Sequence, residues 1–321
     1  MSVEVRKLVE RYLPDFPVVH CGDIYTDTSE FMNISYGDVI ALGGMHYMVF
    51  RDEAERRFGM EDPKYWVKRC RVLETGESRI LKLVFYESFP MKVGPFVLRC
   101  HRSAEKEGRI LDLVKNDPRF MQGISVQDEK GNLVRVLELI RGKRLDVTVD
   151  AIPADHRTYF HEFFPDILAK FIGACEAIGF LHSREEKHGD IRRDHLWVES
   201  GTGRYRWIDF DYAFDFYENP FGLDLFGLGN ILLFLVGKGH HTSQRMSELG
   251  FGEEVFKSLS PQDFSLMFQY RLVNLRKLYP YIPEELNRVL MHFSVGADVF
   301  YETVPEFLEE LCPCLDLVSR L

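Results

Sequence analysis

The first third of the chain contains short strand-like runs, and apolar residues recur at helical spacing beyond it. Residues 65–73 alternate between apolar and polar positions, and residues 38–42 and 79–85 are mostly apolar; all three runs are typical of strands. A polar turn at residues 75–78 separates the last two runs, so the pattern predicts a hairpin there. Residues 53–57 (EAERR) are mostly charged, and we expect a helix or a loop at that point.

Apolar residues at helical spacing predict the remaining elements. Helices are expected at residues 103–115, 161–182, 225–236, 284–293 and 304–311, with a strand at 135–140. A shorter helical pattern ends near Tyr12, where Pro14 and Pro17 follow. Prolines 261, 280, 283, 305 and 313 are expected to separate helices. Strands early and helices late predict an α+β fold class.

Two carboxylates stand out in residues 188–211. Asp190 lies in the loop HGDIRRDH, and Asp209 follows a predicted hairpin whose strands are residues 195–199 and 204–208. The hairpin would bring both carboxylates to the same end. Such a pair suits phosphoryl transfer, in which one carboxylate accepts a proton from the attacking hydroxyl and another holds a metal ion. Taken singly, either Asp is better explained as an ordinary turn residue.

These residues resemble the catalytic and metal-binding loops of the protein kinase-like superfamily, usually His-Arg-Asp-x-x-x-x-Asn and Asp-Phe-Gly. The resemblance implies that Asp190 is the catalytic base and Asp209 the principal metal ligand. Two positions depart from the pattern, because His195 replaces Asn and Asp211 replaces Gly. Ile-Asp-Phe-Asp is also similar to a motif of aminoglycoside and choline phosphotransferases, and some lipopolysaccharide core kinases have His at the Asn position.

The same resemblance assigns roles in the first half of the chain. Lys82, inside the apolar strand ILKLV, would hold the α- and β-phosphates of ATP, although a lone strand lysine often points to solvent. Glu107, three residues before Ile110, would pair with that lysine. Glu105 competes for this role, and a solvated helix face is the alternative for both.

Contacts to the nucleotide leave weaker sequence signals. Gly43 and Gly44 follow a strand and would cover the phosphates, although the Gly-x-Gly-x-x-Gly pattern is absent and a Gly pair is often only a turn. The backbone of Glu138, Leu139 and Ile140 would form hydrogen bonds with the adenine of ATP. His195 and Asp211 would complete the metal site. Because imidazole suits softer ions than Mg²⁺, His195 would either weaken this site or shift its preference toward Mn²⁺, and Asp211 would supply an oxygen ligand.

A short spacing distinguishes this chain from protein kinases. Asp224 begins Asp-Leu-Phe-Gly-Leu-Gly, which resembles the start of a large-lobe helix whose buried Asp anchors the catalytic loop. Only 15 residues separate Asp209 from Asp224, and the Ala-Pro-Glu motif is missing. Three functions therefore stay open: a Ser/Thr protein kinase, which the resemblance favours, a small-molecule or saccharide kinase, and a nucleotide-binding pseudokinase or scaffold.

The resemblance implies a bilobal architecture, with a small antiparallel sheet lobe, a mostly helical large lobe and ATP in the cleft. Residues 1–35 would be an extension, 36–141 the nucleotide-binding lobe and 142–321 the catalytic lobe. The expected cofactors are ATP and Mg²⁺ or Mn²⁺. The expected acceptor is a hydroxyl of a protein or of a small molecule.

Composition and charge limit the classes of partner that we expect. The net charge of −10 argues against general nucleic-acid binding. No apolar run is long enough for a membrane span and no apolar signal core opens the chain, so we expect a cytoplasmic protein. The six cysteines are too few for a disulfide framework. Cys312-Pro313-Cys314 and His240-His241 are only weak metal signals.

Overall fold

The computed structural model describes residues 3–14, 16–57, 60–93, 96–216 and 219–320. Within these ranges the chain divides into two compact units. The first unit contains residues 1–87 and 102–140, and the second contains residues 88–101 and 141–321. Residues 88–101 therefore lie inside the first unit in sequence but pack with the second.

A seven-stranded sheet in the order β1-β2-β3-β4-β5-β9-β8 forms the centre of the first unit. The strands are β1 (Ile24–Tyr25), β2 (Val39–Leu42), β3 (Met45–Arg57), β4 (Met60–Val72), β5 (Ser78–Lys82), β8 (Gly123–Gln127) and β9 (Leu133–Glu138); the helices are α1 (Val3–Tyr12) and α2 (Ala104–Leu113). All neighbouring strands are antiparallel except β1 and β2.

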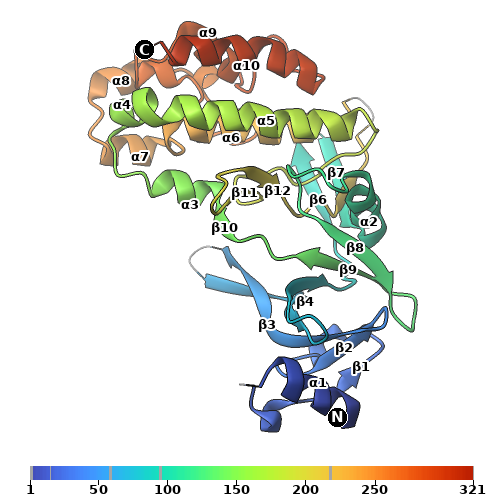
Figure 1. Ribbon diagram of the computed structural model, residues 1–321. Helices are drawn as coiled ribbons and strands as arrows, with labels where there is room; N and C mark the ends of the chain where they lie inside the picture. The colour runs from blue at the N-terminus through green and yellow to red at the C-terminus, as the bar shows by residue number, and fades with distance from the viewer. Residues whose placement is uncertain (1–2, 15, 58–59, 94–95, 217–218, 321) are drawn as a thin grey trace. The chain divides into compact units, whose positions relative to one another are not determined.

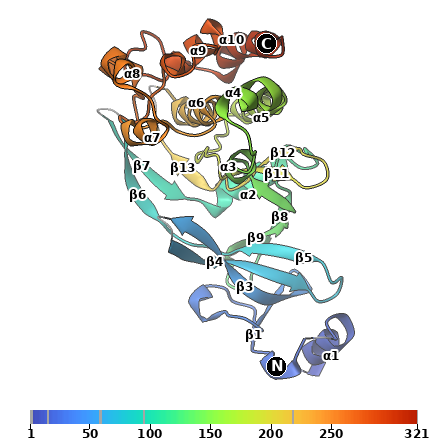
Figure 2. The same cartoon turned by 90° about the vertical axis from the view of Figure 1, so that its left-hand side faces the viewer.

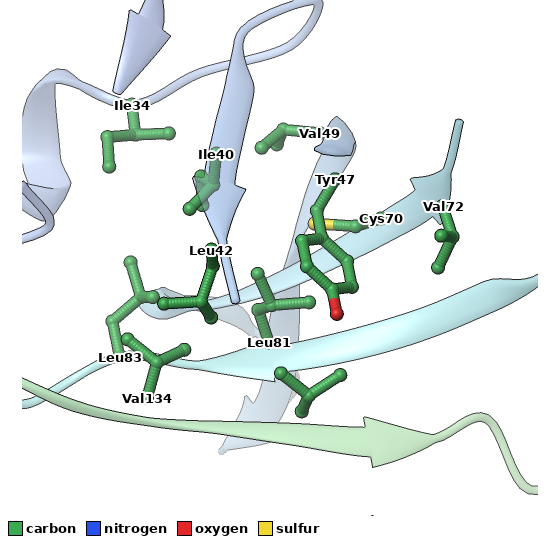
Figure 3. Close-up of a cluster of buried hydrophobic side chains, with 11 residues drawn as sticks. Ile34, Ile40, Leu42, Tyr47, Val49, Cys70, Val72, Leu81, Leu83 and Val134 are labelled. Atoms are coloured by element: carbon green, nitrogen blue, oxygen red, sulfur yellow. The ribbon is translucent and has the colours of Figure 1, made fainter. Parts of the chain in front are cut away.

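Alternating apolar residues of these strands meet in one core. Figure 3 shows side chains from β2, β3, β4 and β5 pointing toward one another, among them Ile40, Tyr47 and Leu81. Ile34, from the segment that precedes β2, joins the same cluster. The alternate apolar positions of these strands therefore form the buried face of the sheet.

Two features of the first unit differ from the sequence-based expectation. Residues 53–57, expected as helix or loop, are the last part of strand β3, which pairs with β4. The long antiparallel pairing with β4 overrides the weak strand preference of Glu and Arg. Residues 1–35 contain not only the expected helix α1 but also β1, which adds to the edge of the sheet.

Helices are the main secondary structure of the second unit. They are α3 (Leu145–Asp150), α4 (His156–Thr158), α5 (Phe164–His182), α6 (Gly222–Gly237), α7 (Ser243–Glu248), α8 (Glu253–Ser258), α9 (Glu284–Met291) and α10 (Val304–Val318), and a π-helical segment, Tyr159–Phe163, joins α4 to α5. Helix α5 packs against α6 and α10, and α9 contacts both α6 and α10 (Figure 1). No described helix combines the length and apolarity that a bilayer crossing requires.

Pro313 lies inside helix α10, although the sequence suggested that it separates two helices. The apolar stripe of this helix continues past the proline, because Leu311, Cys314 and Val318 are all buried. Packing on α5 and α9 therefore offsets the lost backbone hydrogen bond.

Two small sheets complete the second unit. One has the order β10-β11-β12 and contains β10 (Gly142–Arg144), β11 (Leu196–Glu199) and β12 (Tyr205–Trp207). The other has the order β13-β7-β6 and joins β13 (Tyr212–Phe214) to the hairpin of β6 (Ser88–Val93) and β7 (Phe96–Arg102). Figure 2 shows β13 beside that hairpin. The segment that follows Asp211 is therefore held as a strand.

Candidate functional site

The first unit contains a buried group of two cations and one carboxylate. Lys82 Nζ lies 3.0 Å from Glu107 Oε1, and Arg135 Nε lies 3.0 Å from Glu107 Oε2. Each oxygen of the carboxylate therefore takes one cation. Lys82 and Glu107 are 2% and 0% exposed, which excludes the alternative of solvated side chains for both.

Strand register explains why the carboxylate is needed. Lys82 on β5 stands directly opposite Arg135 on β9. Two like charges at directly opposed positions repel each other, and burial strengthens the repulsion. Glu107 on α2 relieves it, and Arg135 is further fixed by bonds from its guanidinium to Leu133 O (2.7 Å) and Leu83 O (3.3 Å).

Glu105, the competing candidate for the ion pair, is on the exposed side of α2. Its carboxylate accepts a hydrogen bond from Ser103 Oγ at 3.1 Å, at the point where the helix begins. Ser103 also caps the helix by accepting from the backbone N–H of Lys106. The structure thus separates an exposed acid in the first turn of the helix from a core acid two residues later.

Gly43 and Gly44 form the two-residue turn between β2 and β3. Both have positive φ, +58° and +79°, which a tight hairpin turn of this kind requires. Turn geometry alone accounts for this glycine pair. Strand β5 pairs with β4, and the connection from β3 to β4 lies outside the described residues. A contact of Gly43 and Gly44 with phosphate stays a prediction.

Glu138, Leu139 and Ile140 lie at the end of β9, where the first unit ends. The backbone N–H of Glu138 already donates to Gln122 O at 2.9 Å, and its side chain accepts from Gln122 N at 2.8 Å. Leu139 and Ile140 follow the strand, so their backbone groups are the better candidates for binding adenine.

In the second unit, the predicted hairpin is present and aligns the carboxylates. The backbone N–H of Ile208 donates to His195 O at 3.0 Å, which continues the β11–β12 pairing up to the residue before Asp209. The His195 ring then lies between two acids, with Nδ1 3.4 Å from Asp190 Oδ2 and Nε2 3.5 Å from Asp209 Oδ2.

The tautomer of His195 follows from its backbone contact. Its Nδ1 lies 2.9 Å from the carbonyl oxygen of Asp190. A carbonyl only accepts hydrogen bonds, so Nδ1 carries the proton and the lone pair of the neutral ring is on Nε2. That lone pair faces the carboxylate of Asp209, an arrangement that a cation between them would stabilise.

The donor pair has a separation that fits a divalent metal ion. Two ligands about 2.1 Å from one ion, at an angle of roughly 90–109°, are about 3.0–3.4 Å apart. The 3.5 Å between His195 Nε2 and Asp209 Oδ2 is close to this range. Within the described residues no group of three His, Cys, Asp or Glu side chains forms a complete metal site. The pair suits an ion whose remaining ligands are phosphate oxygens and water.

The backbone around Asp209 is unusual. Asp209 has φ of +66°, a left-handed conformation that costs free energy for a residue other than Gly. The two residues that follow are almost fully buried, Phe210 at 0% and Asp211 at 2% exposure. Their packing holds Asp209 in its strained conformation.

Asp224 anchors the loop that carries Asp190. Its carboxylate accepts hydrogen bonds from the backbone N–H groups of His188 (2.7 Å) and Gly189 (2.9 Å), and it lies 3.0 Å from His182 Nε2. Despite burial, these bonds lower the pKa of Asp224 to about 2. The buried anchor implied by the resemblance is present, and His182 is part of it.

The environment of Asp190 shifts its pKa in the opposite direction. Burial raises the pKa of its carboxyl, and the nearby charges of His195 and Arg192 only partly offset that rise. Arg192 makes shorter contacts to Asp194, which it binds through Nε at 3.1 Å, than to Asp190 Oδ2 at 3.8 Å. A carboxylate with a raised proton affinity suits the acceptance of a proton.

Sequence reasoning missed Arg135 and Arg192. Arg135 is a charged residue at the start of the apolar run RVLELI. Lys82 was singled out because it is a charged residue in an apolar strand, and the same signal could have identified Arg135. Arg192 belongs to a run of charged residues, IRRD, that gives no indication of which side chain contacts Asp190. Its position depends on the loop conformation, which a sequence pattern does not encode.

Comparison with known proteins bears on the fold. No protein-family model and no curated protein matches the chain. Among solved structures, the kinase domain of Mycobacterium tuberculosis PknI is similar, with a TM-score of 0.50 and 16% identity over 85% of this chain and 97% of that one. The chain has a protein kinase-like fold. The kinase-like fold agrees with the mixed α+β architecture expected from the sequence.

Proposed function

We propose that the protein is an ATP-dependent phosphotransferase that transfers the γ-phosphoryl group to a hydroxyl. The convergence of Asp190 and Asp209 on the ring of His195 is the observation that carries this proposal. The buried pair of Lys82 and Glu107 supports it, because such a pair presents a fixed cation for phosphate oxygens.

In this proposal each residue has one task. Lys82 holds the phosphates and Glu107 positions it, with Gly43 and Gly44 as further phosphate contacts. The backbone of residues 138–140 holds the adenine. Asp190 orients the acceptor hydroxyl and takes its proton, while Asp209, His195 and Asp211 would hold Mg²⁺ or Mn²⁺. The bound ion would neutralise charge on the phosphate oxygens. The ATP donor would place the reaction in the cytoplasm.

The acceptor is proposed on separate grounds. The Asp-x-x-x-Leu-Gly motif that begins at Asp224 resembles protein kinases and favours a Ser or Thr hydroxyl of a protein. A small-molecule hydroxyl is the second candidate, because only 15 residues separate Asp209 from Asp224 and β13 within them is already paired with β7. That spacing leaves little chain for a peptide-docking segment.

The deciding experiment measures turnover of labelled ATP with Mg²⁺ and with Mn²⁺. Wild-type protein is compared with Asp190→Ala and Asp209→Ala, alone and with generic protein and sugar acceptors. Loss of turnover in both variants, with ATP binding retained in Asp190→Ala, would support the proposal. A wild type that binds ATP but transfers phosphate to none of the acceptors would favour a nucleotide-binding scaffold.

A further inference from the structure

Two arginines and a histidine of the second unit converge beside the loop that carries Asp190. The guanidinium of Arg193 lies over the ring of Phe234, 5.2 Å from its centroid, and the ring of His240 packs edge-on against the same Phe234 at 5.5 Å. Arg271 Nη1 donates to Asn230 Oδ1 at 2.8 Å. Asn230 and Phe234 are four residues apart on α6 and therefore share one face of that helix.

Backbone contacts fix this group. The N–H of Leu272 donates to His241 O at 2.8 Å, so the backbone segments that carry Arg271 and His240 lie close together, and the charge of Arg271 acts on the His240 ring. The guanidinium of Arg271 also stacks on Phe268, 3.8 Å from the ring centroid. Both arginines are thus held against aromatic rings, and a ligand would not need to order them.

The positive charge of the group is only partly compensated. Arg193 Nε is 3.8 Å from Asp146 Oδ2, longer than a hydrogen bond, and Asp146 also binds Arg144 at 3.2 Å. No carboxylate among the described residues forms an ion pair with Arg271. Burial and the charge of Arg193 lower the pKa of Arg271 to about 10, so it stays charged at neutral pH.

His240 has hydrogen-bonding capacity that the protein does not use. Both ring nitrogens are buried and have no hydrogen-bond partner among the described residues. A buried polar group in this state destabilises the folded protein, and native structures contain few of them. Burial and the two arginines lower the pKa of His240 to about 2, so the ring is neutral and offers one N–H donor.

We propose that Arg193, Arg271 and His240 bind a phosphate monoester carried by the phosphoryl acceptor. Two guanidinium groups match a dianion in charge, and their planar forks match its oxygens in geometry. Arg193 follows Asp190 by three residues, so the two Cα atoms are at most roughly 11 Å apart. A phosphate held here would leave a hydroxyl of the same small molecule, or of a neighbouring residue, within reach of Asp190.

This inference rests on the proposed function only for the identity of the ligand as the acceptor. Binding is therefore tested first, without turnover, by calorimetric titration of the full chain with inorganic phosphate in the presence of ADP and Mg²⁺. Wild type should bind saturably, and Arg271→Gln and Arg193→Gln should each weaken binding at least tenfold. Arg288→Gln on α9, whose side chain is 63% exposed, is the matched control and should leave binding unchanged.

Arg193 is 38% exposed, so Arg193→Gln tests the site even if Arg271→Gln fails to fold. Equal phosphate affinity in wild type and Arg193→Gln, or no saturable binding to wild type, would overturn the inference. Turnover is then compared for glucose against glucose 6-phosphate, and for a serine peptide against the same peptide with a neighbouring phosphoserine.

The phosphorylated member of one pair should have the lower KM, and Arg271→Gln should raise that KM at least tenfold without changing the KM for ATP. The pair that responds identifies the source of the phosphate. A KM that is equal within both pairs would overturn the assignment to the acceptor. Phosphate binding that depends on Arg193 without any phosphotransfer would overturn the proposed function and leave the anion site standing.

Discussion

The acids at the candidate sites have different surroundings in the two units. In the first unit, Glu107 is fully buried and its two oxygens are each matched by a cation, Lys82 and Arg135. In the second unit, Asp190 and Asp209 are 19% and 18% exposed, and one Oδ2 of each lies 3.4 Å and 3.5 Å from the two ring nitrogens of His195. We therefore expect a bound ligand to stabilise the second arrangement more than the first.

This difference suggests which charged residues contribute to folding stability and which contribute to the proposed reaction. Breaking a buried ion pair leaves an uncompensated charge and costs several kcal/mol of folding free energy. A carboxylate whose pKa is raised by burial already opposes folding while it is charged. A mutation of Glu107 in the first unit should therefore lower folding stability, whereas a mutation of Asp190 in the second unit should lower turnover.

The largest expected effect is on turnover. Asp190→Asn should lower phosphotransfer by about 10²–10⁴-fold, the usual contribution of a positioned general base. The same variant should not lose stability in urea, because it removes a carboxylate that burial disfavours. Asp166→Asn, whose side chain is 70% exposed, is the control. A loss of more than about 2 kcal/mol of stability in Asp190→Asn would show that this acid is structural.

The next effect is on stability. Glu107→Gln should lower the free energy of unfolding by about 3–5 kcal/mol, because Lys82 and Arg135 are left buried with only a neutral partner. Urea unfolding measures this loss, and Glu105→Gln on the exposed side of α2 should change it by less than about 0.5 kcal/mol. Equal unfolding midpoints for the two variants would contradict the contrast between the units.

A pH titration tests Asp224, a buried acid of the second unit whose carboxylate is fully hydrogen-bonded. The pKa of Asp224 is lowered from 3.8 to about 2, so its contribution is complete above the unfolded value and is lost as pH falls from about 4 toward 2. The contribution is about 2 kcal/mol. Unfolding of Asp224→Asn should lack this part of the acid dependence. Parallel stability curves for wild type and variant between pH 5 and pH 3 would argue against the anchor.

The metal preference should depend on His195. We expect wild type to have a higher turnover with Mn²⁺ than with Mg²⁺, because imidazole nitrogen is a better ligand for the softer ion. His195→Asn supplies an oxygen ligand instead and should shift the ratio toward Mg²⁺ severalfold. A ratio that is the same in both proteins would remove His195 from the metal site.

The smallest effect concerns the glycine turn. Gly44→Ala should cost about 1 kcal/mol, because Gly44 has φ of +79° although a Cβ there meets no atom within 4 Å. Gly173→Ala on α5 also meets no atom, and it should be neutral or stabilising. The KM for ATP tests whether Gly44 contacts the phosphates. An unchanged KM in Gly44→Ala would show that this glycine serves only the turn.

Particular residues show how far the sequence could predict the structure. The hairpin after Asp190 and the helix that carries Glu107 follow from local periodicity and turn residues, so both were predictable. The strand at residues 53–57 was not, because its pairing with β4 outweighs the preference of its own side chains. The group of Arg193, Arg271 and His240 was also beyond prediction, since it depends on contacts between residues far apart in the chain.

The placement of the β6–β7 hairpin has a consequence for synthesis on the ribosome. Strand β7 ends at Arg102, yet its partner β13 begins only at Tyr212. The edge of β7 that pairs with β13 stays unpaired while more than a hundred further residues are synthesised, and an unpaired strand edge can pair with other chains. Nascent chains that stop before Tyr212 should therefore aggregate more than the full chain, and deleting residues 88–101 should reduce that difference.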